Sequence, residues 1–188
     1  IKYRKTLSND IILASINREN KTSTNTLNVW KEILSLCKNV KLLILLKSNV
    51  TEEVKNRETY YCEMLNVLPD RLLLIQHLQT ETEYNELFGK VDIMLDPFPY
   101  SGTTTTCNAL NHSIPVITKY HKDYHSHNVS ASLLINSGFP ELVAYSDDEY
   151  VNKVKSLVLN PSRIEKYKES IREKFLKLMD PVRFMKSY

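Results

Sequence analysis

Short apolar runs alternate along this chain with longer segments in which apolar residues recur every three or four positions. Short apolar runs are typical of strands that are buried on both faces of a parallel sheet. Segments with apolar residues at every third or fourth position are typical of helices with one apolar face. The predicted strands are residues 11–16, 40–46, 71–75, 91–95, 115–118 and 142–144. Because strand and helix alternate without a break, the chain is predicted to form an α/β domain with a doubly wound parallel sheet.

The predicted helices carry recognisable start and stop signals. Thr80, followed by Glu83 three residues later, has the form of a capping box, and Gly89 is expected to end that helix. The segment 161–179 is highly charged, so Lys168 is expected to be a solvated surface charge whose removal changes little. The other helices are expected over residues 27–37, 51–65, 104–111, 129–138 and 147–159.

Length and composition narrow the class of protein. Residues 1–9 are interpreted as a lead-in or linker, and residues 10–188 as one unit that forms a domain or one lobe of a larger enzyme. The chain starts at Ile1 rather than Met, so we expect it to be a piece of a longer protein. The longest apolar run, residues 42–46, is far below the roughly 20 residues that span a bilayer, which argues against a membrane protein.

Charge and cysteine usage indicate the kind of partner and the cellular compartment. The net charge of +3 is spread along the chain. No stripe of Lys and Arg interleaved with aromatic residues is present, which argues against a nucleic-acid partner. The three cysteines are dispersed and odd in number, which fits buried thiols in a reducing compartment and makes the cytoplasm the expected location: Cys37, Cys62 and Cys107.

The most informative stretch covers residues 91–108 and reads as a strand, a stiff turn and a helix start. Pro97 and Pro99 fix the backbone and remove donors, so the loop is predicted to be rigid. Gly102 allows either a turn with positive φ or the close approach of a ligand to bare backbone. Residues 103–106 are all threonine, and their hydroxyls are expected to face outward together with the free N–H groups of the helix start.

Two interpretations of this helix start follow. Unpaired N–H groups and the positive end of the helix dipole would bind phosphate, at the sheet edge where parallel sheets bind ligands. The alternative is an ordinary capped helix. Lys21, in the loop after the first strand, is expected at the same edge, where it either neutralises a phosphate or is solvated. Asp96 either caps its own loop or faces the ligand.

Other motifs are absent or ambiguous. The chain has no G-x-G-x-x-G, G-x-S-x-G or P-loop pattern, which argues against NAD or FAD, serine hydrolase chemistry and a P-loop nucleoside triphosphatase. His121, His125 and His127 are close in sequence, but no cysteine or H-E-x-x-H pattern accompanies them, so a metal site is not favoured. These histidines either bond a ligand, act as a general base, or belong to a solvated loop.

Several motifs together resemble a known family. Residues 95–107, 115–118, 125–129 and 132–134 match, in order and spacing, the C-terminal lobe of the O-GlcNAc transferase / SPINDLY glycosyltransferases. The likeness extends over about residues 10–150. The four-threonine turn ending in a cysteine and the His-x-His-Asn-Val run resemble the SPINDLY branch.

The resemblance implies one lobe of a GT-B enzyme, which consists of two Rossmann-like lobes and holds a nucleotide sugar mainly in the C-terminal one, without a metal or other cofactor. For the SPINDLY branch it implies transfer of fucose from GDP-fucose to Ser or Thr of acceptor proteins. The other branch transfers GlcNAc from UDP-GlcNAc, and a non-catalytic nucleotide-sugar-binding scaffold module is a third reading. An N-terminal lobe and TPR repeats upstream, and a cytoplasmic or nucleocytoplasmic location, are expected.

The resemblance also assigns site residues. Lys21 matches the family lysine that meets the diphosphate and is the expected catalytic residue. Three departures affect base and ribose recognition: Arg18 stands where the family has an amide, Asn108 where an acidic residue is usual, and Tyr84 where a histidine is expected. The expected nucleotide-sugar-binding residues are Asn17, Arg18, Lys21, Gly102, Thr103, Thr104, Thr105, Asn108, His127 and Asn128.

Overall fold

The computed structural model describes residues 10–181; residues 1–9, interpreted as a lead-in, and residues 182–188 lie outside the described part. A parallel sheet forms its centre. Its strands are β1 (Ile11–Ser15), β2 (Val40–Leu45), β3 (Leu72–Ile75), β4 (Ile93–Leu95), β5 (Val116–Lys119) and β6 (Val143–Ala144). Within the described residues the strand order is β3-β2-β1-β4-β5-β6, so the direction of chain progression reverses between β1 and β4. The predicted doubly wound parallel α/β sheet is confirmed.

The helices lie where the apolar periodicity predicts them. They are α1 (Thr24–Leu36), α2 (Thr51–Leu65), α3 (Glu81–Phe88), α4 (Thr104–Asn111), α5 (Val129–Asn136), α6 (Asp147–Leu159) and α7 (Pro161–Leu178). The capping box of Thr80 and Glu83 is present at the start of α3. Four short 3₁₀ turns in the described residues were not predicted: η1 (Glu19–Lys21), η2 (Pro69–Arg71), η3 (His125–His127) and η4 (Pro140–Leu142).

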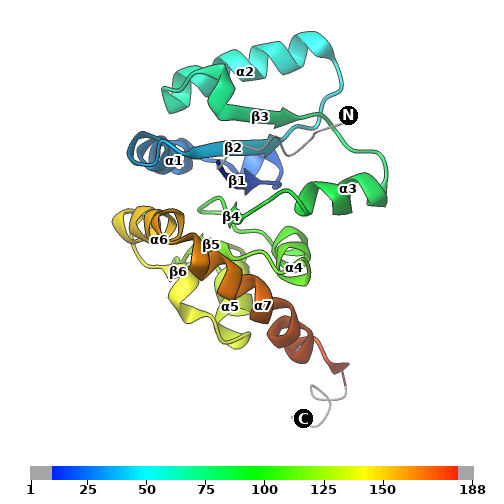
Figure 1. The fold of residues 1–188 in the computed structure, drawn as a ribbon, viewed down its shortest axis with the longest axis vertical. Helices are drawn as coiled ribbons and strands as arrows, with labels where there is room; N and C mark the ends of the chain where they lie inside the picture. Colours follow the sequence, from blue (N-terminus) through cyan, green and yellow to red (C-terminus); the bar gives the residue numbers. More distant parts are fainter. Residues whose placement is uncertain (1–9, 182–188) are drawn as a thin grey trace.

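Apolar side chains on both faces of the sheet meet flanking helices. Leu13, Leu42 and Ile93, on β1, β2 and β4, are fully buried. Helix α1 packs on α6, and α4 packs on α7. In Figure 1, α1 and α6 lie along one side of the sheet and α3 and α4 along the other. Because both faces are covered, the strands read as continuous apolar runs. Within residues 10–181, no helix is both long and apolar enough to cross a membrane.

Lys168 on α7 differs from its predicted role. Its ammonium lies 3.0 Å from Oδ1 of Asp92, and Oδ2 of Asp92 accepts the backbone N–H of Ile12 at 2.9 Å. Burial opposes the charged form, but the hydrogen bond and charge of Asp92 outweigh it, so the pKa of Lys168 is raised. The expectation of a solvated surface charge was therefore wrong, because the carboxylate that Lys168 meets is distant in sequence and could not be seen in the helical pattern.

Candidate functional site

Two loops meet at the carboxyl edge of the sheet, where the strand order reverses. One holds η1, directly after β1, and the other is the β4 loop, residues 96–103. The Lys21 ammonium donates a hydrogen bond of 2.9 Å to the carbonyl oxygen of Ser101 and lies 4.4 Å from the ring centroid of Tyr100. The structure thus places Lys21 against the β4 loop, as the topology predicts.

The β4 loop is anchored by side-chain hydrogen bonds to the start of α1 and to the loop after β5. The Ser23 and Thr26 hydroxyls, at the start of α1, donate to the carbonyl oxygen of Phe98 at 2.7 and 2.6 Å. The Ser101 hydroxyl donates to the carbonyl oxygen of Ser126 at 3.1 Å. Two prolines and these bonds leave the loop little freedom, in agreement with the rigid turn predicted.

Asp96 is the buried centre of this loop. Its Oδ1 accepts the N–H of Gly102 at 2.8 Å, and its Oδ2 accepts the Thr118 hydroxyl at 2.7 Å. Burial raises the pKa of Asp96 to about 6, although hydrogen bonds and the charge of Lys21 oppose the rise. Of the two roles left open by the sequence, the geometry corresponds to capping of its own loop, and the N–H of Gly102 is consequently turned inward.

Gly102 is required by crowding from the protein itself. A Cβ at this position would lie 2.6 Å from Oγ1 of Thr106, 2.9 Å from Oδ1 of Asp96 and 3.2 Å from Oδ1 of Asn17. Among the described glycines a positive φ occurs at Gly138 and not at Gly102, so a left-handed turn is not the reason for glycine at position 102. Of the two causes raised from the sequence, a positive φ is wrong, and crowding by side chains of the same chain is by itself enough to require glycine.

The start of α4 is uncapped. Its N-cap residue, Thr103, makes no side-chain capping bond, and the same is true at the starts of α2, α5 and α7. Side chains of Ser23, Thr80 and Ser146 do cap α1, α3 and α6. This geometry disfavours the ordinary capped helix and leaves the first N–H groups of α4 available for an anion. The uncapped start lies just after Ser101, the residue that Lys21 holds.

The four threonines do not all face outward. Thr103 and Thr104 are exposed and Thr105 is half-buried, but Thr106 is buried. Its hydroxyl lies 2.7 Å from that of Ser130 on α5, which in turn donates to the carbonyl oxygen of Gly102 at 3.0 Å. The prediction was wrong for Thr106, because the turn of the helix directs this position toward α5 rather than solvent.

The remaining predicted residues on this side are placed as follows. Asn17 is buried, and its Oδ1 has no hydrogen-bond partner within residues 10–181. Arg18 is exposed at the start of η1. Asn108 lies near the phenol of Tyr84; burial raises the pKa of that phenol, and Asn108 opposes the rise. Two positions that depart from the family pattern therefore contact each other, and Tyr84 also packs edge-on against Phe88 at 5.1 Å between centroids.

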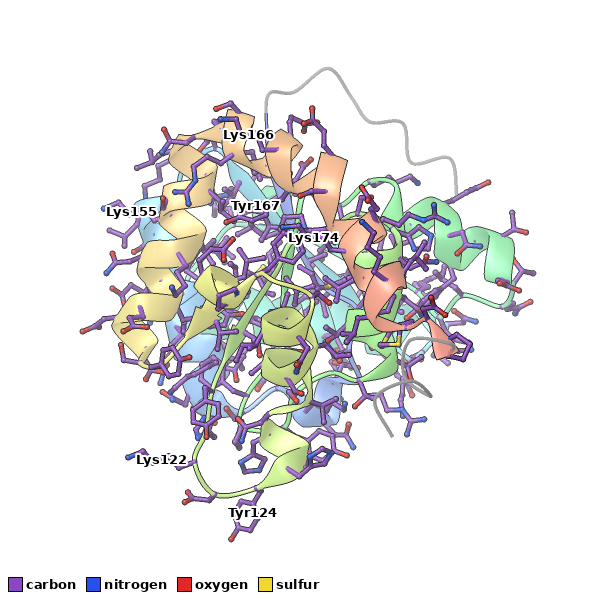
Figure 2. The ribbon with its side chains drawn as sticks, turned by 90° about the horizontal axis from the view of Figure 1, so that it is seen from below. Lys122, Tyr124, Lys155, Lys166, Tyr167 and Lys174 are labelled. Atoms are coloured by element: carbon purple, nitrogen blue, oxygen red, sulfur yellow. The ribbon has the colours of Figure 1, made fainter. Side chains whose placement is uncertain are left out.

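His127 and Asn128 belong to the loop that follows β5. Asn128 uses its amide within that loop: Oδ1 accepts the N–H of His121 at 2.8 Å, and Nδ2 donates to the carbonyl oxygens of His121 and Tyr124. The His127 ring lies 5.6 Å from that of His121 and 5.1 Å from that of Tyr124. Figure 2 shows Lys122 and Tyr124 pointing away from the body on this loop. Asn128 thus shapes the loop, which touches the β4 loop through Ser126.

No group of three or more His, Cys, Asp or Glu residues that could hold a metal occurs in the described part of the chain. The rings of His121 and His127 lie 5.6 Å apart, but in the described residues no third ligand joins them to form such a group.

A family model agrees with this architecture: that of glycosyl transferase family 41 matches residues 2–183. The chain belongs to glycosyl transferase family 41. The family resemblance expected from the sequence is confirmed.

Curated relatives of this family 41 chain are SPINDLY proteins of plants. The Solanum lycopersicum protein named "Probable UDP-N-acetylglucosamine--peptide N-acetylglucosaminyltransferase SPINDLY" is 33% identical over 184 residues, which are 96% of this chain and 20% of that protein. The Arabidopsis thaliana protein of the same name is 32% identical over 168 residues, 89% of this chain and 18% of that protein. The chain therefore spans about a fifth of the length of these relatives.

Solved structures give the same fold. A mutant of Thermobaculum terrenum O-GlcNAc transferase superposes with a TM-score of 0.81 at 23% identity, covering 90% of this chain and 32% of that one. Sucrose-phosphate synthase of Thermosynechococcus elongatus superposes with a TM-score of 0.64 at 15% identity, covering 91% and 42%. The family 41 chain thus has the fold of one lobe of a GT-B glycosyltransferase, as predicted.

Sequence reasoning missed the polar residues that hold the site in place. Thr118 and Ser130 bond Asp96 and Gly102 from β5 and α5, and Glu19 on η1 accepts a hydrogen bond from Tyr61 on α2. The position of Thr118, a polar residue at the carboxyl end of a predicted strand, was the one feature of the sequence that could have indicated a site residue. The Glu19–Tyr61 hydrogen bond joins positions 42 residues apart, and nothing in the sequence pattern indicated it.

Proposed function

We propose that this family 41 chain holds the nucleotide-sugar donor of a protein O-glycosyltransferase, with the diphosphate in the corner between Lys21 and the start of α4. The observation that carries the proposal is the Lys21–Ser101 hydrogen bond, which sets an ammonium beside an uncapped helix N-terminus. Two independent sources of positive potential meet there, and both favour a dianion.

Each group in the corner retains capacity to bind phosphate. An ammonium has three donors, and Ser101 uses one of those of Lys21, so two are free for phosphate oxygens. Since Asp96 holds the N–H of Gly102, the backbone donors toward the ligand are those of the first turn of α4, from Thr104 and Thr105. The exposed hydroxyls of Thr103 and Thr104 supplement them.

The transfer step increases charge at this corner. The bond between the anomeric carbon and the β-phosphate oxygen breaks, and its electrons remain on the nucleotide diphosphate. The acceptor hydroxyl oxygen bonds that carbon and loses its proton to water or to the departing diphosphate. Lys21 and α4 stabilise that leaving group as its charge grows. A divalent metal is not required in this scheme, because the ammonium and the helix dipole offset the diphosphate charge.

For the donor we propose GDP-fucose, on the basis of the four-threonine turn and the SPINDLY relatives. UDP-GlcNAc is the second candidate, because the names of those relatives specify N-acetylglucosaminyl transfer. A scaffold module that binds a nucleotide sugar without transfer is the third. Incubation of the full-length protein with an acceptor protein and each donor in turn, followed by mass spectrometry of the acceptor, separates them. We expect a deoxyhexose to be added to the acceptor from GDP-fucose in the presence of EDTA. Addition of an N-acetylhexosamine would instead identify UDP-GlcNAc as the donor. If neither sugar is added, the scaffold function is the one supported.

The wider setting is also a proposal. Because the chain spans about a fifth of its relatives, we place an acceptor-binding lobe and TPR repeats in other parts of the full-length protein. A Ser/Thr-containing acceptor protein is the expected partner. Cys37, Cys62 and Cys107 are free, which is typical of a reducing compartment and supports a cytoplasmic or nucleocytoplasmic location.

A further inference from the structure

The turn that carries Lys21 is not held by apolar packing. None of the residues of η1 is buried. A cavity of about 650 Å³ lies against η1. It is lined by Leu46 and by polar residues of η1, of the segment after β2 and of α2, among them Asn20, Ser48 and Glu53. A single 3₁₀ turn beside open space has little intrinsic stability, so its position depends on the polar contacts that it makes.

Glu19, the first residue of η1, makes the contact to the body of the domain. Its Oε1 accepts the hydroxyl of Tyr61 at 3.0 Å and lies 3.5 Å from Nε of Arg57. Tyr61 is buried, and burial, followed by the charge of Glu19, raises the pKa of its phenol far above the usual range, so it remains a donor at neutral pH. Arg57 is half-exposed, and such an ion pair contributes little.

The turn transmits this contact to Lys21. Glu19 and Lys21 are its two ends, and it is closed by bonds from Lys21 N to Arg18 O and from Thr22 N to Glu19 O, both of 2.9 Å. At the other end the Lys21 ammonium reaches Ser101. One turn therefore bridges α2 and the β4 loop.

We propose that Glu19 is a positioning residue for Lys21, and that its bond to Tyr61 holds η1 so that the ammonium reaches the donor diphosphate. The proposal rests on the proposed function of Lys21. Glu19 does not touch the donor in this scheme. It acts through the backbone of η1 alone.

A first test follows the turn itself and needs no substrate. Hydrogen exchange of the full-length protein reports the amides of Lys21 and Thr22, in wild type, Glu19→Ala and Tyr61→Phe. Loss of one net hydrogen bond should speed their exchange about 3- to 10-fold, while exchange of β1 stays unchanged. Glu53→Ala is the matched control, because Glu53 lines the same cavity and makes none of the hydrogen bonds to η1.

A second test links the turn to catalysis. Tyr61→Phe and Glu19→Ala should lower kcat about tenfold with little change in KM, whereas Glu19→Gln should stay near wild type because its amide oxygen still accepts from Tyr61. Lys21→Ala serves as the reference. If Lys21→Ala is fully active, the proposed function of Lys21 fails; if it is inactive and Tyr61→Phe keeps wild-type exchange or wild-type kcat, the positioning role of Glu19 is overturned.

Discussion

Lys21 and Ser101, eighty residues apart in the chain, are joined by a hydrogen bond of 2.9 Å from the ammonium to the carbonyl oxygen. The bond crosses the point where the strand order of the sheet reverses, between the loops after β1 and β4. It places a positive charge next to the uncapped start of α4. The predictions below test this corner and the contacts that support it.

Replacement of Lys21 tests its role in the transition state. Lys21→Ala in the full-length enzyme should lower kcat by about 10²- to 10³-fold, beyond any change in KM, because leaving-group charge is greatest in the transition state. Lys166→Ala is the control: Lys166 is exposed on α7, and Figure 2 labels it on the outer surface. Steady-state kinetics, with thermal melting to check folding, gives the answer. Equal kcat in the two variants would refute the role.

Replacement of two glycines tests the crowding beneath the β4 loop. Gly102→Ala should cost about 1–3 kcal/mol of unfolding free energy, because its Cβ would meet Thr106 at 2.6 Å and Asp96 at 2.9 Å. Gly89→Ala should be neutral or slightly stabilising, since its nearest neighbour would be Glu86 O at 3.5 Å and its φ is −61°. Urea denaturation of both variants measures the difference. A Gly102→Ala variant as stable as Gly89→Ala would show that the loop yields to a side chain.

The buried Asp96 predicts a pH dependence of stability. Its pKa of about 6 in the folded protein exceeds the ordinary value of 3.8, so the protonated carboxyl is favoured by folding and its ionisation destabilises the fold. The stabilisation from the protonated carboxyl is fully present below pH 3.8 and is lost as pH rises through 6, a change of about 3 kcal/mol. Urea denaturation between pH 4 and about pH 7.5 should show wild type losing stability relative to Asp96→Asn. Parallel pH curves for the two proteins would count against a raised pKa at Asp96.

Two lysines of α7 form a matched pair. Lys168→Ala removes the cation from the largely buried carboxylate of Asp92, which keeps the N–H of Ile12, and should destabilise the fold by about 1–3 kcal/mol. Lys177 pairs with Glu173 on the exposed side of the helix, and Lys177→Ala should leave the unfolding midpoint unchanged. Chemical denaturation resolves a difference of this size. The role assigned to the Lys168–Asp92 pair is wrong if the two variants unfold at the same midpoint.

The elements were predictable because their signals are local. Helices α2, α4 and α6 begin and end at the residues that apolar spacing, an acidic first turn and prolines indicate, and the capping box of α3 lies at Thr80. The strand runs were equally legible, since a sheet covered on both faces leaves continuous apolar segments.

The polar contacts of the site were not predictable, because each joins residues far apart in the chain. Thr106 turns inward to meet Ser130, Glu19 meets Tyr61, and Lys168 meets Asp92 across 76 residues. Periodicity indicates which face of a helix is buried, but it does not indicate which polar group, distant in sequence, that face contacts. The proximity of Lys21 to the β4 loop was the exception, because parallel topology alone brings those two loops to one edge.

Calorimetric titration of GDP and UDP into the full-length protein, wild type and Lys21→Ala, tests the central claim that a nucleotide diphosphate binds between Lys21 and α4. We expect wild type to bind GDP more tightly than UDP, and Lys21→Ala to weaken GDP binding by about tenfold or more, which corresponds to about 1.4 kcal/mol. Wild-type affinity in the Lys21→Ala variant, or no binding of either nucleotide to wild type, would contradict the claim.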